Sequence, residues 1–368
     1  MNQNNPPPLI THVYTADPSA HVFPSPNSES KTKRLYIYPS HDIPNPTPAS
    51  DLGAQYAMND YHVFSLPTLS TLPGPVPVTD HGVVLSLADI PWAKEQLWAP
   101  DAVRRGGKYY LVFPAKDKQG VFRIGVASGE KPEGPFVPEE TWLGGEGVGG
   151  IDPAVFVDST PGDGEEEEEE EEEGEAYVYF GGVWGGQLQC WRKKDSDSDS
   201  EEGGWIFDEA ILKSGIGEPS GAGTRALFPR VAKLSKDMKT LLTPVLELQI
   251  LSPEPGNPPI RADDHTRRFF EASWMHKRNS TYYFSYSTGD THYIVYATGT
   301  SPLGPFTYRG RILEPVVGWT THHSIVEFEG RWWIFYHDCE ISEGVSHLRN
   351  VKVREIGYDE EGGIFLVD

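Results

Sequence analysis

One strand–turn–strand pattern recurs along this 368-residue sequence and limits the folds that the chain can adopt. Residues 108–136 (KYYLVFPAKDKQGVFRIGVASGEKPEGPF) resemble residues 281–306 (TYYFSYSTGDTHYIVYATGTSPLGPF). Each copy starts with an aromatic strand, passes through a polar turn into a second strand, and ends in Gly-Pro-Phe. Because self-similarity of this kind is typical of repeat architectures, the same template is expected elsewhere in the chain.

Five copies fit this template, and each has a polar residue at the head of a short apolar strand. These residues are Asp17 (ADPSAHVF), Asp101 (APDAVRR), Asp152 (IDPAVFVD), Glu271 (FFEASWMHK) and His322 (THHSIVEF). Five units of about four strands each, with few helical periods, predict an all-β, five-bladed β-propeller. The innermost strand of each blade runs along the central channel, so the five polar residues are predicted to converge at one mouth of that channel.

Two acidic insertions interrupt the repeats, at about residues 159–175 and 193–204. The first contains nine consecutive glutamates, and the second contains DSDSDSEE. Such tracts bury too little apolar surface to order, so we predict solvated loops within one propeller domain spanning residues 1–368. The glutamate run falls between the first and second strands of its unit, which places it on the face opposite the cluster of polar residues.

Composition excludes several classes of function. The formal net charge of −23 argues against binding to nucleic acid, which requires a basic face. No apolar run approaches the length of a membrane span, and the start MNQNNPPPLI lacks the features of a signal peptide, so a cytoplasmic location is expected. Cys190 and Cys339 lie in apolar strand-like contexts and are predicted to be reduced thiols. The oligomeric state stays open.

The converging carboxyl groups indicate acid–base chemistry. Like charges in a partly dry pocket push each other's pKa values apart, so that one acid stays protonated while another ionises. One protonated and one ionised carboxyl are the minimum for glycoside hydrolysis. An Asp-Pro pair at a strand start is often only a turn or cap, but the shared position of these acids in the repeat favours a site. The apolar neighbours of Glu271 favour its protonated form.

The five motifs resemble glycoside hydrolase family 43. The resemblance rests on YTADPSAHVF, WAPDAVRRGGKYYLVF, IDPAVFVD, FFEASWMHKRNSTYYFSYSTGDTH and VVGWTTHHSIVEF, in this order, from about residue 9 to the C-terminus. It implies a five-bladed propeller and an inverting glycosidase. It also implies roles: Asp17 as general base, Glu271 as general acid, and Asp152 as the acid that orients Glu271 and tunes its pKa. Inversion would require the Asp17 and Glu271 carboxyl groups to lie about 6.5–9.5 Å apart.

The same resemblance implies residues that bind the sugar. Trp98, in WAPD, would line the sugar pocket, whereas Asp101 beside it is expected to be structural. Trp184, in GGVWGGQ, would shape the next sugar site or pack under its Gly-rich loop. Arg349, in SHLRNVKV, would bind sugar hydroxyls, with a surface arginine as the alternative.

A metal ion is the last feature that the resemblance implies. His322, rather than His323, would face the channel and be the only protein ligand of a Ca²⁺ ion that is otherwise coordinated by water. The alternative is a histidine that only binds buried water.

The predicted activity is the release of terminal β-1,4-xylosyl or α-L-arabinofuranosyl residues from xylo- or arabino-oligosaccharides. The segments PAKDKQGVFRIGVA and FSYSTGDTH look most like the xylosidase/arabinofuranosidase branch of the family. Two alternatives remain at this stage. One is an endo-arabinanase, which would need an open groove, and the other is a catalytically idle propeller that binds sugar or serves as a scaffold.

Overall fold

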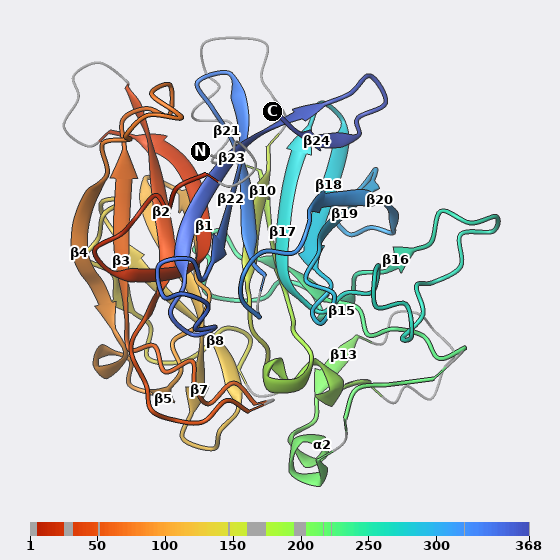
Figure 1. Ribbon diagram of the computed structural model, residues 1–368. Helices are drawn as coiled ribbons and strands as arrows, with labels where there is room; N and C mark the ends of the chain where they lie inside the picture. The colour runs from red at the N-terminus through yellow and green to blue at the C-terminus, as the bar shows by residue number, and fades with distance from the viewer. Residues whose placement is uncertain are drawn as a thin grey trace.

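Most of the described strands form five sheets arranged around a central axis, as Figure 1 shows for the computed structural model, and β12 (Trp191–Lys193) and β13 (Trp205–Phe207) form a separate two-stranded sheet. The structure describes residues 6–25, 32–50, 52–145, 148–159, 174–194, 204–215, 217–221, 223–319 and 321–367. The predicted all-β, five-bladed propeller is therefore confirmed. The glutamate run lies outside the described residues, and so does its predicted position on the far face.

Each blade is built from one continuous part of the chain, and its innermost strand comes first except in blades II and IV, where the short strands β5 (Ala93–Glu95) and β16 (Ile250–Leu251) precede it. Blade I contains β1 (Tyr14–Pro24), β2 (Lys33–Asp42), β3 (Asp60–Leu66) and β4 (Thr79–Ser86). Blade II contains β6 (Asp101–Arg105), β7 (Lys108–Asp117), β8 (Phe122–Gly129) and β9 (Val137–Pro138), and β5 also pairs with β7. Blade III contains β10 (Ala154–Asp158), β11 (Glu175–Phe180), β14 (Arg230–Leu234) and β15 (Leu246–Glu247).

The remaining two blades complete the ring. Blade IV contains β17 (Glu271–Arg278), β18 (Thr281–Ser287), β19 (Ile294–Gly299), β20 (Phe306–Leu313) and β16 (Ile250–Leu251), which runs parallel to β20. Blade V contains β21 (His323–Phe328), β22 (Arg331–Asp338), β23 (Asn350–Tyr358) and β24 (Ile364–Leu366). All other strand pairs within the blades are antiparallel, as the short turns between consecutive strands require.

The ring closes where the first and last blades meet. Strand β1 contacts β21, β22 and β23, so the two ends of the described chain lie side by side (Figure 1). Two backbone hydrogen bonds join them: Leu9 N donates to Val351 O, and Thr15 N donates to Arg349 O. This closure brings residues from opposite ends of the sequence to the same mouth of the channel.

The core lies between neighbouring blades, because both faces of most strands are buried. In β2, for example, Leu35 and Ile37 pack with blade V, whereas the alternating residues Tyr36 and Tyr38 pack with blade II. A strand with two buried faces reads as a nearly continuous apolar and aromatic run. This is the reason that the second strand of each repeat could be recognised in the sequence.

Small elements lie in the loops between the blade strands, and all but the first of them fall between β11 and β14 of blade III. They are the 3₁₀ helices Leu87–Asp89, Trp184–Gly186 and Leu188–Cys190, the hairpin of β12 (Trp191–Lys193) and β13 (Trp205–Phe207), and the helix α2 (Glu209–Ser214). Cys190 and Cys339 are buried and free, as predicted. Within the described ranges, no helix has the length and apolar character needed to cross a membrane.

The five polar residues of the repeat do not occupy one identical strand position. Asp101 and Glu271 are the first residues of β6 and β17, whereas Asp152 and His322 lie just before β10 and β21. Asp17 departs from the prediction, because β1 already begins at Tyr14. The strand is interrupted at Asp17 by a register shift between Ala16 and Ser19, which turns the Asp17 side chain toward the channel mouth.

Candidate active site

A cavity of about 400 Å³ opens at the mouth of the channel. All seven residues that the sequence assigned to catalysis, sugar binding or metal binding line it: Asp17, Trp98, Asp152, Trp184, Glu271, His322 and Arg349. The loops that follow the second strands of blades I, III and V supply much of the remaining wall. The corresponding loops of blades II and IV do not contribute to the lining.

Backbone strain marks the three acids. Asp17 and Asp152 have φ angles of 48° and 52°, and Ala272, next to Glu271, has a φ of 63°. Positive φ values are unfavourable for residues other than glycine and cost about 1–3 kcal/mol each. In β17 the strained residue coincides with a register shift between Glu271 and Trp274. Bulges of this kind redirect side chains, and here they direct carboxyl groups into the cavity.

Asp17 is held by hydrogen bonds on both carboxylate oxygens. Oδ1 accepts a hydrogen bond from Arg349 Nη1 (2.9 Å), and Oδ2 accepts one from Ser40 Oγ (2.7 Å). Its backbone N–H donates to His337 Nδ1 (3.0 Å), which fixes the bulge. Burial by itself would raise the pKa of Asp17, but the Arg349 charge, His337, His322 and the Ser40 hydroxyl together lower it below its ordinary value. Asp17 is therefore ionised at neutral pH.

Arg349 is itself fixed by a second carboxylate, Asp42. The Arg349 Nε and Nη2 atoms donate to the two Asp42 oxygens, each over 2.8 Å, and the Arg349 backbone N–H donates to Oδ2 over 2.9 Å. Both side chains are buried. The paired geometry holds the guanidinium in one orientation, with Nη1 directed at Asp17. Arg349 thus lines the cavity as predicted, while all three nitrogen atoms of its guanidinium bond to the protein's own carboxylates.

Asp152 connects blade III to the strand that carries Glu271. Its Oδ2 accepts a hydrogen bond from the backbone N–H of Ala272 over 2.8 Å. This bond ties the bulge of β17 to the loop before β10, and so it positions the neighbouring Glu271. Burial and the nearby negative charges of Glu271 and Asp17 raise the pKa of Asp152 well above its ordinary value.

Glu271 has the environment of a proton donor. Burial, followed by the negative charge of Asp17, raises the pKa of Glu271 to about 8, and Arg349 opposes these effects only in part. Gly182 allows this close packing, because an added Cβ atom would lie 2.6 Å from the Ile151 side chain and 3.4 Å from Glu271 Cβ. Glu271 is therefore protonated at neutral pH, whereas Asp17 in the same cavity is not.

Of the two adjacent histidines, His322 lines the cavity and His323 does not. His322 Nδ1 lies 3.8 Å from Asp17 Oδ1 and 3.7 Å from Asp152 Oδ2. Burial lowers the pKa of His322, so the ring is neutral at pH 7. His323 is instead a buried packing residue whose Nε2 lies 2.6 Å from Ser285 Oγ.

Asp101 lies outside the cavity lining and joins three blades. Its Oδ1 accepts a hydrogen bond from Ser19 Oγ (2.5 Å) and lies 2.7 Å from His21 Nε2, both on blade I. Its Oδ2 accepts one from the backbone N–H of Val155 on blade III (2.5 Å). The expected convergence of five polar residues therefore involves four of them, and the fifth cross-links the inner strands.

Trp98 lies against the loop of residues 43–59 that connects β2 to β3. Its Nε1 donates to Tyr56 O over 2.9 Å, and the Trp98 and Tyr56 rings meet edge to face with their centroids 6.2 Å apart. Gly53 allows the loop to reach the indole, because an added Cβ atom would lie 2.6 Å from the Trp98 ring. This loop forms one wall of the cavity, with Ser50, Gly53 and Tyr56 among its lining residues.

Trp184 is stacked on a second tryptophan that sequence reasoning missed. The Trp184 and Trp319 rings are nearly parallel, with an interplanar angle of 7° and centroids 6.0 Å apart. Trp184 Nε1 donates to Glu218 Oε2 over 3.1 Å, and its ring meets Phe270 edge to face. Both indoles line the cavity, where aromatic faces can cover the apolar C–H surface of a sugar ring.

Four further residues that line or support the cavity were not identified from the sequence: Asp42, Tyr56, Phe270 and Trp319. Trp319 lies three residues before His322 in the motif VVGWTTHH, and this proximity is the signal that could have found it. Asp42 ends the second strand of blade I, but its partner Arg349 is 307 residues away, and no local pattern links the two.

This arrangement supplies one ionised and one protonated carboxyl group in a single aromatic-lined cavity. The ionised Asp17 can accept a proton from water, and the protonated Glu271 can donate one to a leaving group. Hydrolysis of a glycosidic bond requires these two capacities on opposite sides of the bond. The site therefore fits a carbohydrate substrate by its chemistry as well as by its aromatic walls.

Comparisons with known proteins agree with this chemistry. The sequence profile of the glycosyl hydrolases family 43 matches residues 76–189 and 229–364. A xylosidase/arabinosidase 43A of Humicola insolens is 59% identical, over 97% of this chain and 98% of that protein. A xylosidase/arabinosidase of Bacteroides ovatus is 48% identical, over 98% of this chain and 97% of that protein.

A solved structure extends the likeness to three dimensions. It is a GH43 β-xylosidase/α-arabinofuranosidase from a compost microbial metagenome, in complex with xylotriose and in a calcium-free form. It shares 51% sequence identity with this chain, covers 97% of this chain and 96% of its own, and superimposes with a TM-score of 0.81.

Proposed function

The chain belongs to family 43 of the glycosyl hydrolases, and we propose that it is an inverting exo-glycosidase that releases terminal β-1,4-xylosyl residues, α-L-arabinofuranosyl residues or both from oligosaccharides. The proposal rests on one observation: the pKa values of two carboxyl groups in one cavity are shifted in opposite directions. The pKa of Asp17 is lowered, whereas that of Glu271 is raised to about 8. The names of the relatives support the choice of sugars.

In the proposed reaction, Asp17 takes a proton from a water molecule as that water attacks the anomeric carbon. Glu271 donates its proton to the departing glycosidic oxygen, so that the leaving group departs as a neutral alcohol. Asp152 acts through its bond to Ala272 N as a positioning residue for Glu271. The predicted separation of about 6.5–9.5 Å between the Asp17 and Glu271 carboxyl groups stays a prediction.

The walls of the cavity favour an enzyme that acts at chain ends. The loop of residues 43–59 forms one wall, and the stacked Trp184 and Trp319 form another. An endo-acting arabinanase would need a groove that is open on both sides. Because walls close this cavity, they argue against that alternative. The strained acids speak against an idle scaffold, because a scaffold has no use for carboxyl groups held at positive φ.

We also propose that His322 is the protein ligand of a hydrated Ca²⁺ ion. The neutral His322 ring can coordinate an ion, but Asp17 Oδ1 already accepts a hydrogen bond from Arg349. Ca²⁺ prefers six to eight oxygen ligands, so the residues present fit only an ion that is coordinated mostly by water. Such an ion would add positive charge close to Asp17 and Asp152. A Ca²⁺-dependent rise in Tm that His322→Gln abolishes would support this site, and an equal rise in both proteins would exclude it.

The activity is tested by initial rates on 4-nitrophenyl β-D-xylopyranoside and on the corresponding α-L-arabinofuranoside. We expect the wild-type chain to hydrolyse at least one of them, and ¹H NMR of the first product to show the inverted anomer. The Asp17→Asn variant, whose shape is nearly unchanged, should be inactive on both. Retention of the anomeric configuration would contradict the assigned roles, and the absence of activity on both substrates would overturn the proposed sugars.

A further inference from the structure

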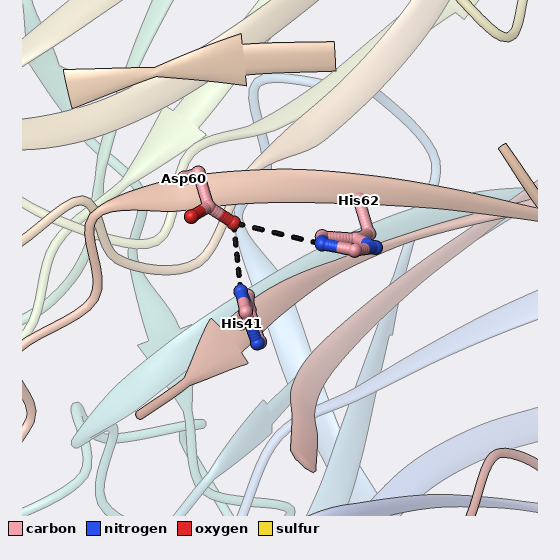
Figure 2. Close-up of side chains that lie close together, drawn as sticks. All are labelled: His41, Asp60 and His62. Atoms are coloured by element: carbon pink, nitrogen blue, oxygen red, sulfur yellow. Dashed lines mark hydrogen bonds and ion pairs between the residues drawn. The ribbon is translucent and has the colours of Figure 1, made fainter. Parts of the chain in front are cut away.

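A second cluster of ionisable side chains lies outside the cavity, on blade I. It consists of His41, Asp60 and His62, which point toward one another from two neighbouring strands (Figure 2). Each residue offers one ligand atom, and these atoms all lie within 4.8 Å of one another. We propose that this cluster binds a divalent transition-metal ion of the Zn²⁺ class through two imidazole nitrogens and one carboxylate oxygen.

Strand pairing brings the three residues together. In the antiparallel pair of β2 and β3, Ile37 lies opposite Phe64. Continuing this register places His41 opposite Asp60. His62 follows two residues after Asp60, and therefore lies on the same face of the sheet. The cluster is thus held on two paired strands, which gives its members fixed relative positions.

The distances suit an ion shared by the three groups. His41 Nδ1 and Asp60 Oδ1 lie 2.7 Å apart, so they share a proton when no ion is bound. His62 Nε2 lies 3.8 Å from the same Oδ1 atom, which is too long for a hydrogen bond. Coordination bonds to zinc are about 2.0–2.2 Å long. Two such bonds from His62 and Asp60 would meet at about 130°, whereas those from His41 and Asp60 would meet at about 80°, so the His41 ring has to move away from Asp60 by about 0.7 Å to reach tetrahedral geometry. Binding would displace the proton from His41 Nδ1, and the neutral ring can carry it on Nε2 instead.

A further carboxylate orients His62 in the way that metal-bound histidines require. The far ring nitrogen, Nδ1, lies 3.1 Å from Asp80 Oδ1. Asp80 is fixed in turn, because it accepts a hydrogen bond from Gly82 N (2.7 Å) and its Oδ2 lies 2.8 Å from His12 Nε2. With its proton on Nδ1, His62 directs the lone pair of Nε2 toward Asp60. A carboxylate behind a ligating histidine is the usual outer partner in metal sites.

The donor set and exposure indicate the class of ion. Two nitrogens and one oxygen suit Zn²⁺ and related ions, whereas Ca²⁺ prefers oxygen ligands. The side chains of His41, Asp60 and His62 are 19%, 23% and 13% exposed. An ion can therefore enter from solvent and keep a position for water. This site differs in place and in chemistry from the Ca²⁺ site proposed at His322.

The position of the cluster gives the ion a consequence for the active site. His41 and Asp60 flank the two ends of the loop of residues 43–59, whose Gly53 and Tyr56 line the cavity. An ion bound to both would hold the ends of this loop together and stiffen that wall. Only this consequence for substrate binding rests on the proposed function, because binding of the ion itself is measured without any substrate.

The test is a calorimetric titration of Zn²⁺ into the full chain after treatment with a chelator and removal of the chelator. Excess Ca²⁺ is present throughout, to keep the site at His322 from contributing. We expect one Zn²⁺ per chain. The double variant His41→Gln/His62→Gln should bind at least about 100-fold more weakly, and Asp80→Asn, which leaves all three ligands in place, about 10- to 100-fold more weakly. Visible absorption of bound Co²⁺ should report the same order of affinities.

Two control variants test whether other histidines account for the binding of Zn²⁺. His81→Gln changes a neighbouring blade I histidine that bonds to Ser65, and His322→Gln changes the one in the cavity. Both should bind Zn²⁺ as the wild type does. The absence of Zn²⁺ binding by the wild type, or unchanged affinity in both the double variant and Asp80→Asn, would overturn the proposal. Slower amide hydrogen exchange in residues 43–59 on addition of Zn²⁺, in the wild type alone, would support the effect on the loop, and unchanged exchange would refute it.

Discussion

The blade I side of the cavity surrounds Asp17 with a cation and hydrogen-bond donors, whereas the blade IV side surrounds Glu271 with packed apolar groups. Arg349 and Ser40 each donate a hydrogen bond to an Asp17 oxygen. Glu271 lies instead beside Gly182 and Ile151, and burial is the main influence on its pKa. Two carboxyl groups of the same cavity therefore differ in their proton affinity because of what touches them.

In the proposed mechanism, this difference lets one type of functional group serve both as the acid and as the base. Burial raises the pKa of any carboxyl group, so the base needs specific compensation, and the acid does not. The compensation comes from Arg349, which Asp42 holds by a paired hydrogen bond. The network of Asp17, Arg349 and Asp42 is thus as important for the base as the apolar packing is for the acid.

The largest effect is expected when either carboxyl group is replaced by its amide. Asp17→Asn should lower kcat/KM about 10³- to 10⁴-fold on xylobiose and on 4-nitrophenyl xyloside alike, because both reactions need an activated water. Glu271→Gln should lower it to a similar extent on xylobiose, but much less on the nitrophenyl substrate, whose leaving group needs little protonation. Glu314→Gln, at an exposed site, serves as the control. Equal losses on both substrates for Glu271→Gln would argue against its role as the acid.

The next largest effect is expected from removal of the cation. Arg349→Met should raise the pKa of Asp17 and move the acid limb of the kcat/KM profile upward by about 1–3 pH units. It also leaves Asp42 buried without its partner, which should lower the free energy of unfolding by about 3–5 kcal/mol. Denaturant unfolding measures the second effect and pH–rate profiles the first. An acid limb that stays in place would show that Arg349 does not control Asp17.

The raised pKa of Glu271 predicts how activity and stability change as the pH rises. Because we propose that protonated Glu271 is the catalytic acid, we expect kcat/KM to fall as the pH rises through about 8. The unfolded chain has an ordinary glutamate, so between its ordinary pKa and about 8 the folded state holds more protons and stability falls with rising pH.

The Glu271→Gln variant tests this stability prediction, because glutamine cannot ionise. It should have a Tm about 2 °C or more above the wild type at pH 9, with a smaller difference at pH 5. Thermal unfolding at both pH values is the measurement. A difference that is the same at pH 5 and pH 9 would mean that ionisation of Glu271 is not the cause.

The smallest effect is expected from substitutions in the aromatic wall of Trp184 and Trp319, because this wall does not favour one carboxyl group over the other. Trp184→Ala removes one face of the stacked pair with Trp319 and should raise KM about 2- to 10-fold with little change in kcat. The KM of Trp184→Phe, which keeps an aromatic ring, should lie between the KM values of Trp184→Ala and the wild type. Steady-state kinetics on xylobiose checks both. A fall in kcat without a change in KM would place Trp184 in the positioning of the acids rather than in sugar binding.

Periodicity along the sequence was sufficient to predict the fold and the convergence of the acids, whereas the residues expected to bind sugar came from the resemblance to the family. Alternating buried residues in strands such as β2 produce the aromatic runs that mark each repeat. The polar residues Asp17, Asp152 and Glu271 stand at related positions in those repeats, and the propeller brings them to one mouth. Asp101 shows the limit of that reasoning, because the same position in blade II holds a residue that bonds to blades I and III instead.

Local patterns therefore predicted the five-bladed architecture and the polar residues at the heads of its inner strands, whereas the roles of the three acids and the candidates Trp98, Trp184 and Arg349 came from the resemblance of the motifs to the family. Only the tertiary structure decided which acid keeps its proton, which residues complete the walls, and that His41, Asp60 and His62 meet. The physical reason is the distance along the sequence between the residues that determine each property. A strand's alternation is set by its immediate neighbours, whereas the pKa of Asp17 depends on Arg349, 332 residues away, which closure of the ring brings within 2.9 Å.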